Sequence, residues 1–396
     1  MRALSILISF LLLLGNLGKA QKSGSTDSNN QFAFDFFKQL SVNEKGNIFF
    51  SPISISSAMA MTYAGAKGET QSQISKVFHF SSNNKKFHSQ QGRIPKQLIS
   101  KADSIQLSIV NTLWAERSYP IKKSFSKTLR KSYSATVMHV DFINRFEESR
   151  LLINDNISKS TYEKINNLLP TGSVNSLTRL VLTNAVYFKA DWATKFQKER
   201  MGDANFYLTP QSPIRCKMMG IKSKFDYYED ENIQALELAY SGNNFSMLII
   251  LPRPNLSLDA LVKGITQDSL KSMIKGLEMQ EITISIPKYK LSTGYQLKQV
   301  LSGMGMPQPF SDNANFSRMT TRNDLKISDV FHNAFIEVNE QGTEAAAATA
   351  VVIAMKSTGN EKFFIANRPF IFIIREKTSG SILFMGRMVD PTKSEQ

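Results

Sequence analysis

The residue types that most often carry catalysis are few in this chain and stand far apart. Its 396 residues include four histidines, each isolated from the others: His79, His88, His139 and His332. No HExxH, GxSxG, glycine-rich phosphate loop or Cys/His metal-ligand spacing is present. A catalytic triad built from distant residues is not excluded, but no motif points to one. We therefore expect neither an enzyme nor a metal or cofactor site.

The most unusual segment is EQGTEAAAATAVVIAMKSTGN, from Glu340 to Asn360. Between Glu344 and Lys356 eleven residues carry no charge, although a fifth of the chain is charged. Its alanines favour a helix, whereas the β-branched residues that follow favour a strand. The closing Ser-Thr-Gly-Asn favours an exposed turn. Taken alone, the segment would be interpreted as a helix or a flexible linker.

As a strand, this segment would present alternate side chains to opposite faces. One face would carry Thr343, Ala345, Ala347, Thr349 and Val351. The other would carry Glu344, Ala346, Ala348, Ala350 and Val352. Only the second face holds a charge, so the first is the face that can be buried. Its small side chains would also let the strand enter between two neighbours.

The patterns along the rest of the chain mix helices and strands without regular alternation. Helical spacing of apolar residues occurs at 31–40 and 53–68. Residues 179–188, 245–252 and 281–289 have the composition of buried or half-buried strands. This order predicts an α+β fold. No linker or composition shift divides the chain, so we expect one large domain.

The N-terminal residues MRALSILISFLLLLGNLGKA have the layout of a cleavable secretory signal. Arg2 precedes an apolar run from Ala3 to Leu14, which is too short to span a bilayer. Cleavage after Ala20 would remove residues 1–20 and leave 21–396 as the mature domain. We therefore expect a secreted, extracellular protein.

The chain is strongly basic, with 48 lysines and arginines against 33 acidic residues. Without the signal, 46 basic residues would remain, a net charge of +13. For a secreted protein such a field favours a glycosaminoglycan over nucleic acid or a membrane. The single cysteine, Cys216, excludes an internal disulfide and fits a small buried side chain better than a reactive thiol.

Four separated motifs together resemble the serpin family. They are NIFFSPISISSAMAMTYAGAKGET (47–70), LTRLVLTNAVYFKADWATKF (177–196), FHNAFIEVNEQGTEAAAATA (331–350) and FIANRPFIFIIREKTSGSILFMGRMVDP (364–391). Their order and spacing agree with that family over nearly the whole mature chain. The resemblance implies three sheets, about nine helices and an exposed reactive loop at about 340–363. It also implies a monomer that traps serine proteases covalently when the cut loop enters the large sheet.

The resemblance assigns roles to the residues of the alanine-rich segment. Its hinge would comprise Gly342, Thr343, Glu344, Ala345, Ala346, Ala347, Ala348 and Thr349. The cleaved bond would join Lys356 to Ser357, fourteen positions after the hinge glycine. A lysine there suits trypsin-like proteases, because an acidic pocket can pair with its ammonium group. A register shifted by one residue would place the cut after Met355 and favour chymotrypsin- or elastase-like proteases.

Other positions match the family's supporting residues. A polar cluster beneath the opening sheet, the shutter, would consist of Ser51, Ser54, Asn184 and His332. Trp192 would lie at the top of the sheet, the breach, where the hinge enters. The segment 153–161 resembles the family helix that crosses the large sheet. Three positions depart from the family pattern: Asn156, in that segment, stands where an aromatic residue is usual, Ala190 replaces a usual glycine, and Gln341 replaces a usual charge.

The sequence also contains surface signals. Sequons for N-glycosylation occur at Asn156, Asn244, Asn255 and Asn315. Two basic clusters are candidates for heparin binding, and their central residues are Arg93, Lys96, Lys101, Lys123, Lys127 and Arg130. Solvated surface charge is the simpler interpretation of both clusters.

The sequence therefore predicts a secreted inhibitory serpin without nucleic-acid or membrane binding. The alternatives are a non-inhibitory serpin that acts as a carrier or signalling protein and an extracellular polyanion-binding protein. A hydrolase is a more distant alternative.

Overall fold

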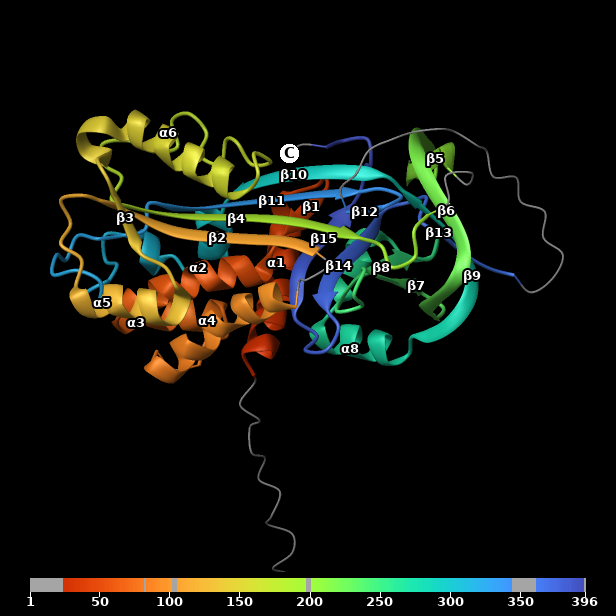
Figure 1. Cartoon of the computed structure of the whole chain (residues 1–396), viewed down its shortest axis with the longest axis horizontal. Coiled ribbons are helices and arrows are strands. Elements are labelled where there is room, and N and C mark those ends of the chain that lie inside the picture. Colours follow the sequence, from red (N-terminus) through yellow and green to blue (C-terminus); the bar gives the residue numbers. More distant parts are fainter. Residues whose placement is uncertain (1–23, 82, 102–104, 197–200, 344–360, 395–396) are drawn as a thin grey trace, which may run out of the picture.

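The computed structural model describes residues 24–81, 83–101, 105–196, 201–343 and 361–394 (Figure 1). Its α-helices are α1 (Ser25–Asn43), α2 (Pro52–Gly65), α3 (Gly68–Val77), α4 (Lys85–Ser100), α5 (Lys123–Thr128), α6 (Phe142–Ser160), α7 (Leu258–Gly264), α8 (Gln267–Lys275) and α9 (Lys298–Gly303). A π-helix, η1 (Leu129–Tyr133), and a 3-10 helix, η3 (Gln308–Phe310), are also present.

The strands are β1 (Ile48–Phe50), β2 (Ile105–Glu116), β3 (Val137–Val140), β4 (Leu180–Asp191), β5 (Met201–Thr209), β6 (Ser212–Glu229), β7 (Ile233–Ala239), β8 (Phe245–Pro252), β9 (Glu278–Pro287), β10 (Tyr289–Gln296), β11 (Asp329–Val338), β12 (Gly342–Thr343), β13 (Lys362–Ile365), β14 (Phe370–Glu376) and β15 (Ile382–Met388). The α+β fold expected from the sequence is confirmed. The predicted helices 31–40, 53–68 and 153–161 correspond to α1, α2 and part of α6. The predicted strands correspond to β4, β8 and β9.

A six-stranded sheet, which we call the large sheet, has the order β10-β11-β12-β4-β2-β3. β4 pairs antiparallel with β2 along most of its length. On its other side β4 pairs parallel with β11 over seven residue pairs, from Val181–Asp329 to Tyr187–Phe335. α6 lies on one face of this sheet, and α2 and α4 lie on the other (Figure 1).

Helix α2 is the central support beneath the large sheet. Its cap residue Ser51 accepts a hydrogen bond from the N–H of Ser54 (3.4 Å), and Pro52 occupies the first turn, where no intrahelical N–H bond is needed. Almost every residue of α2 is buried. Its apolar and small residues are spread around the helix because sheets and helices pack on all its sides.

The remaining strands form a nine-stranded sheet along the path β1-β15-β14-β8-β7-β6-β9-β13, with β5 paired to β6. The 18-residue strand β6 pairs with β5, with β9 and, at Asp226–Glu229, with β7. Because β6 is shared, the two smaller sheets that the resemblance implies are joined by hydrogen bonds into one continuous sheet.

Three apolar clusters hold these layers together. The first joins the helices to the strands and includes Phe32 stacked on Phe78 with ring centroids 4.3 Å apart. The second lies between the two sheets, where Phe49 stacks on Phe384 at 5.0 Å. The third lies between α6 and the large sheet and includes Ile153. None of the helices formed by the described residues has the length and apolarity that a membrane crossing requires.

Candidate functional site

The predicted hinge enters the large sheet as the two-residue strand β12. This strand lies between β11 and β4, where Thr343 pairs with Val338 and with Ala190. Both residues of β12 are buried. The parallel pairing of β4 with β11 ends at Tyr187 and Phe335, so β12 occupies the space just beyond that end.

Gly342 lies too close to the backbone of β4 to carry a side chain. A Cβ at this position would lie 2.0 Å from the carbonyl oxygen of Ala190 and 2.4 Å from the Cα of Asp191. The turn that leads into β12 is closed by Asn339, whose Oδ1 accepts hydrogen bonds from the N–H groups of Gln341 (3.1 Å) and Gly342 (3.3 Å). The glycine therefore permits the close approach of β12 to β4.

Trp192 contacts the turn that leads into β12. Its indole N–H donates to the carbonyl oxygen of Asn339 (2.8 Å), and its ring stacks on Tyr240 at 4.6 Å. The Tyr240 hydroxyl lies 3.1 Å from Thr343 Oγ1, and burial raises the pKa of Tyr240. Thr343 therefore points into the core, the direction that strand alternation predicts for it. Ala190 is buried opposite Thr343, so its methyl group fits where the family pattern has glycine.

An ion pair fixes the chain just before the hinge. Lys288 Nζ lies 2.6 Å from Glu340 Oε2, and the Glu340 side chain is only 3% exposed. The Glu340 carbonyl oxygen accepts a hydrogen bond from the N–H of Phe196 (3.0 Å). These contacts hold the start of the segment against the connection between β9 and β10.

The predicted shutter residues are brought together near the middle of the pairing between β4 and β11. His332 Nε2 accepts a hydrogen bond from the N–H of Ser51 (3.1 Å), and His332 Nδ1 bonds to Asn184 Oδ1. Asn184 donates to the hydroxyl of Ser54 and to Asn111 Oδ1. Ser54 Oγ also donates to Asn111 Oδ1 (3.3 Å). The network therefore joins α2, β2, β4 and β11 in one set of hydrogen bonds.

This arrangement requires a neutral His332. Its Nε2 accepts from a backbone N–H, so the ring proton resides on Nδ1 and is donated to Asn184. Burial lowers the pKa of His332 to about 3. Because Asn184 lies on β4 and His332 on β11, their bond must break if these strands separate.

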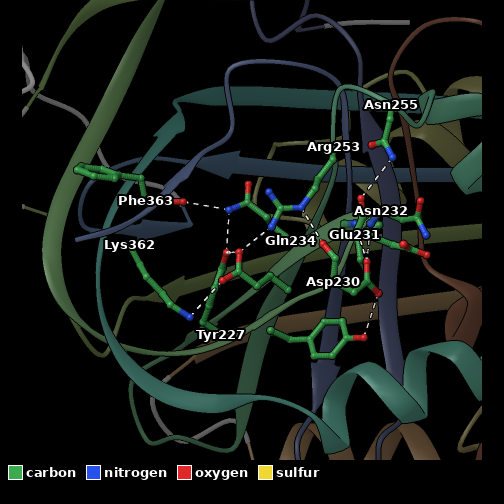
Figure 2. Close-up of polar contacts among 12 residues, drawn as sticks. Tyr227, Asp230, Glu231, Asn232, Gln234, Arg253, Asn255, Lys362 and Phe363 are labelled. Atoms are coloured by element: carbon green, nitrogen blue, oxygen red, sulfur yellow. Dashed lines mark hydrogen bonds and ion pairs between the residues drawn. The ribbon is translucent and has the colours of Figure 1, made fainter. Parts of the chain in front are cut away.

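The far end of the segment is anchored by β13, which pairs parallel with β9. Figure 2 shows the polar contacts beside it. Lys362 Nζ lies 3.1 Å from Glu229 Oε1, and Arg253 lies 2.6 Å from Glu229 Oε2. Gln234 donates to the carbonyl oxygen of Phe363 (3.0 Å).

Two further groups complete the anchor of β13. Tyr227 donates to Glu229 Oε2 (2.9 Å). Partial burial raises the pKa of Glu229, but hydrogen bonds from Tyr227 and Lys362 outweigh that effect and keep the pKa below its usual value. Glu361 is held by Lys222 Nζ (2.8 Å) and by the hydroxyl of Thr283 (3.1 Å). The chain is thus fixed at Glu361 and Lys362 as well as at Gly342 and Thr343.

Several predicted site residues lie outside the described residues. They are Glu344, Ala345, Ala346, Ala347, Ala348, Thr349, Met355, Lys356 and Ser357, together with the signal at 1–20. The four sequon asparagines are described, and all are exposed: Asn156, Asn244, Asn255 and Asn315. Cys216 is buried, and burial raises the pKa of its thiol to about 11, as expected for an unreactive cysteine.

The predicted heparin-binding residues have different surroundings. Lys101 pairs with the buried carboxylate of Glu376 at 2.8 Å. Lys96 lines a cavity beside β2, whereas Lys127 lines a separate cleft near the start of α4. The other three are exposed and line neither hollow: Arg93, Lys123 and Arg130.

The cleft at Lys127 brings together basic residues from distant parts of the sequence. Its volume is about 670 Å³, and Lys85, Lys131 and Arg318 also line it. Among the described residues, no acidic side chain lines this cleft. Burial, followed by the nearby charge of Arg318, lowers the pKa of His88 in its wall to about 4.

Sequence reasoning missed three residues that the structure places at the site. Asn111 completes the polar network, Tyr240 contacts the hinge threonine, and Glu229 anchors β13. Asn111 and Glu229 lie on strands, and Tyr240 directly follows β7. Each has partners distant in sequence, and no local motif surrounds it.

We expect His332 to make stability depend on pH. Its pKa is lowered in the folded protein, so the unfolded chain, with an ordinary pKa near 6.5, takes up the proton first. The stabilisation is complete above about pH 6.5 and is lost as pH falls toward about 3, by about 1.4 kcal/mol per pH unit. The free energy of unfolding of His332→Gln, measured with denaturant between pH 7 and 5, should fall less steeply with falling pH than that of the native protein. The reason is that the variant takes up about one proton fewer when it unfolds. An equally steep decline would contradict this assignment; His139→Gln, at an exposed position, is the control.

Comparison with known proteins agrees with this geometry. Residues 27–391 match the family model described as Serpin (serine protease inhibitor). The chain is 40% identical over 369 residues to leukocyte elastase inhibitor of Xenopus tropicalis, covering 91% of this chain and 97% of that protein. The crystal structure of uncleaved ovalbumin aligns with a TM-score of 0.85 at 31% identity, over 93% of this chain and 100% of that one. Thyroxine-binding globulin in complex with thyroxine aligns with a TM-score of 0.85 at 28% identity, over 93% and 99%. The chain therefore belongs to the serpin family of serine protease inhibitors.

Proposed function

We propose that this serpin is a secreted suicide-substrate inhibitor of trypsin-like serine proteases, cut between Lys356 and Ser357. The observation that carries the proposal is that the chain is fixed on both sides of residues 344–360. Before them, Gly342 and Thr343 already lie between β4 and β11; after them, Lys362 is held on β9. A cut between the anchors would free the first part of the segment to continue the strand that β12 begins.

The register of β12 predicts where each further residue would lie. Gly342 pairs with Asp191 and Thr343 with Ala190, so each following residue would pair one position earlier on β4. Residue 353 would then reach Leu180, the first residue of the 12-residue strand β4. The cut at Lys356 would lie just beyond the far end of the filled sheet. A protease attached there would be carried the length of β4.

The same register would place Thr349 between Asn184 and His332. Separation of β4 from β11 breaks the hydrogen bond between Asn184 and His332, and buried polar groups require new partners. The hydroxyl of Thr349 can both donate and accept. The inserted strand therefore replaces the contact that its entry disrupts.

The chemistry of trapping is ordinary acyl transfer interrupted by movement. The protease serine attacks the carbonyl carbon of Lys356, the bond to Ser357 breaks, and the Ser357 amine leaves with the proton that the protease supplies. Loop insertion into a sheet is an established behaviour of serpins. Because β13 holds the leaving side, the two new ends separate as the acyl side inserts.

Two alternatives have specific support. Relatives named leukocyte elastase inhibitor favour cleavage after Met355 and an elastase- or chymotrypsin-like target. The likeness to thyroxine-binding globulin with bound thyroxine favours a non-inhibitory carrier. The residue at the cut and the uncharged hinge face support the trypsin-like inhibitor over both.

Secretion and glycosylation complete the proposal. The N-terminal signal at 1–20 supports export, and the exposure of all four sequon asparagines is compatible with glycans on each. Polyanion binding by the cleft around Lys127 is a second proposed property. It is supported by the convergence of Lys85, Lys131 and Arg318, with no acidic residue in the part of the lining that the structure describes.

Lys356→Ala should abolish inhibition of trypsin and leave the circular dichroism spectrum unchanged, because the protease pocket loses its charged partner. Met355→Ala is the matched control and should retain trypsin inhibition. Residual activity and detergent-stable complexes are measured against trypsin, chymotrypsin and elastase. If the native protein inhibited elastase but not trypsin, and Met355→Ala lost elastase inhibition, the cut would lie after Met355 instead.

Thr343→Arg should turn the inhibitor into a substrate. Burying an unpaired guanidinium against Tyr240 costs several kcal/mol, so cleavage and release would outrun insertion. Gln341→Arg adds the same charge at an exposed position and should leave trapping intact. Gels of each variant with trypsin compare covalent complex with cleaved protein. An undiminished complex yield from Thr343→Arg would show that this face is not buried.

Retention on a heparin column should fall steeply with salt if the cleft binds polyanions, because exposed charges are screened. A Lys127→Gln and Lys131→Gln double variant should elute at lower salt than the native protein. Lys101→Gln, which removes a lysine already paired with Glu376, serves as comparison. Absence of retention at physiological salt would exclude this property.

A further inference from the structure

A hollow of about 490 Å³ lies between the connection that follows α6 and the strands β10 and β11. Its volume falls within the range of about 300–1,000 Å³ that is usual for small-molecule sites. Ile165, Leu168 and Phe331 belong to its lining but are each no more than 3% exposed. The side chains that remain accessible in it are mainly polar. Its chemistry therefore differs from that of most small-molecule sites, whose walls are largely apolar.

Four carboxamide side chains from three parts of the chain converge on this hollow: Asn166, Asn167, Gln296 and Asn333. The hydroxyl of Ser158 donates a hydrogen bond to Asn166 Oδ1 (2.7 Å). The side-chain amide of Asn154 donates to Asn167 Oδ1 (3.2 Å). Both carboxamide oxygens are thus bound within the protein, and each side chain keeps an amino group that can donate. Ser292 adds a hydroxyl to the lining, which can donate and accept.

The connection that carries Asn166 and Asn167 is fixed to α6. Asn154 accepts a hydrogen bond from the N–H of Leu169 (2.8 Å) and donates to the carbonyl oxygen of the same residue (2.9 Å). Arg150 donates to that carbonyl oxygen as well (2.8 Å). Because this wall is held in place before a ligand arrives, less conformational freedom is lost on binding.

The opposite wall is the outer edge of the large sheet, formed by β10. The N–H of Ser292 donates to the carbonyl oxygen of Ser394, which lies outside the sheet. Alternate residues of a strand direct their backbone groups to the same side, so Gly294 also directs its N–H and C=O away from β11. A Cβ at Gly294 would lie 3.0 Å from Oδ1 of Asn333. The glycine therefore leaves the Asn333 carboxamide accessible from the hollow.

We propose that this hollow binds a neutral sugar of one or two rings. Lys164 is the one charged residue among the described residues that line it, so neither a polyanion nor a cation would find a matching set of charges there. An apolar ligand would deprive the accessible carboxamides of hydrogen bonds to water, which is unfavourable. Sugar hydroxyls both donate and accept, as do carboxamides and the backbone of Gly294. A ring bound between the connection and β10 would therefore have hydrogen-bond partners on both sides.

The binding experiment uses the full mature chain and maltose as the probe. Saturation-transfer NMR should show maltose binding that saturates. Gly294→Thr should abolish it, because the added side chain enters the hollow and displaces the Asn333 carboxamide. Threonine is favoured in strands, and circular dichroism checks that the fold is kept. Lys290→Thr adds the same residue at an exposed position of β10 outside the hollow, so this matched control should bind maltose like the native protein.

A second comparison tests the carboxamides. Asn333→Ala should weaken maltose binding by about two- to tenfold, the loss expected for one neutral hydrogen bond. Gln299→Ala removes an exposed carboxamide outside the hollow and should leave binding unchanged. Absence of saturable maltose binding, or equal binding by the native protein and Gly294→Thr, would overturn the site. Clearly tighter binding of glucuronate than of glucose would overturn the assignment to a neutral ligand.

The location of the bound sugar is measured separately, because sugars excluded from protein surfaces stabilise folded proteins in general. Maltose should slow backbone hydrogen exchange at residues 164–170 and 292–296 in the native chain but not in Gly294→Thr. Slowing spread evenly over the chain would overturn a specific site. No protease enters these measurements, so they decide the sugar site independently of the proposed inhibition.

Discussion

The parallel pairing of β4 with β11 is the interaction on which the rest of this structure depends. Because β4 and β11 are parallel, a strand inserted between them can run antiparallel to both, and β12 already has that orientation. Gly342 and Thr343 are seated between the two strands, and further along β4 and β11 hydrogen-bond to each other. Further entry of a strand would exchange the seven residue pairs between β4 and β11 for pairs on both sides of the new strand.

The polar network across these strands must rearrange if the strands separate. We call the contact between β4 and β11 the seam. A purely apolar seam would hold no group that needs a new partner on opening, whereas a buried hydrogen-bonded group must find one when its bond breaks. Asn184 and His332 face each other across the seam and are supported by Ser51, Ser54 and Asn111. Burial keeps the imidazole neutral, so opening the seam exposes no charge.

The two ends of the intervening segment are held by different kinds of contact. At the hinge the backbone is packed so tightly that Gly342 has no space for a side chain. At β13 the contacts are ion pairs centred on Glu229 and Glu361, beside a regular parallel strand pair. The hinge end is therefore held by backbone packing inside the large sheet, and the far end by ion pairs and strand pairing with β9.

The sequence by itself determined the main elements, the family and the candidate residues of the segment. Long apolar patterns such as those of α1 and β8 are local, and local periodicity predicts them. It also determined that Thr343 belongs to an uncharged face, because strand alternation depends only on order along the chain. The predicted polar cluster followed from family motifs, since nothing local links Ser51 to His332.

Only the tertiary structure decided which distant residues meet. Asn111 joined the polar network and Tyr240 reached the hinge because strand pairing brings together residues more than 70 positions apart. Lys127 lines a cleft, Lys96 lines a cavity and Lys101 forms an ion pair, because the neighbours of each side chain come from other elements. Spacing along a chain fixes a residue's own element and face, whereas long-range packing fixes what lies opposite it.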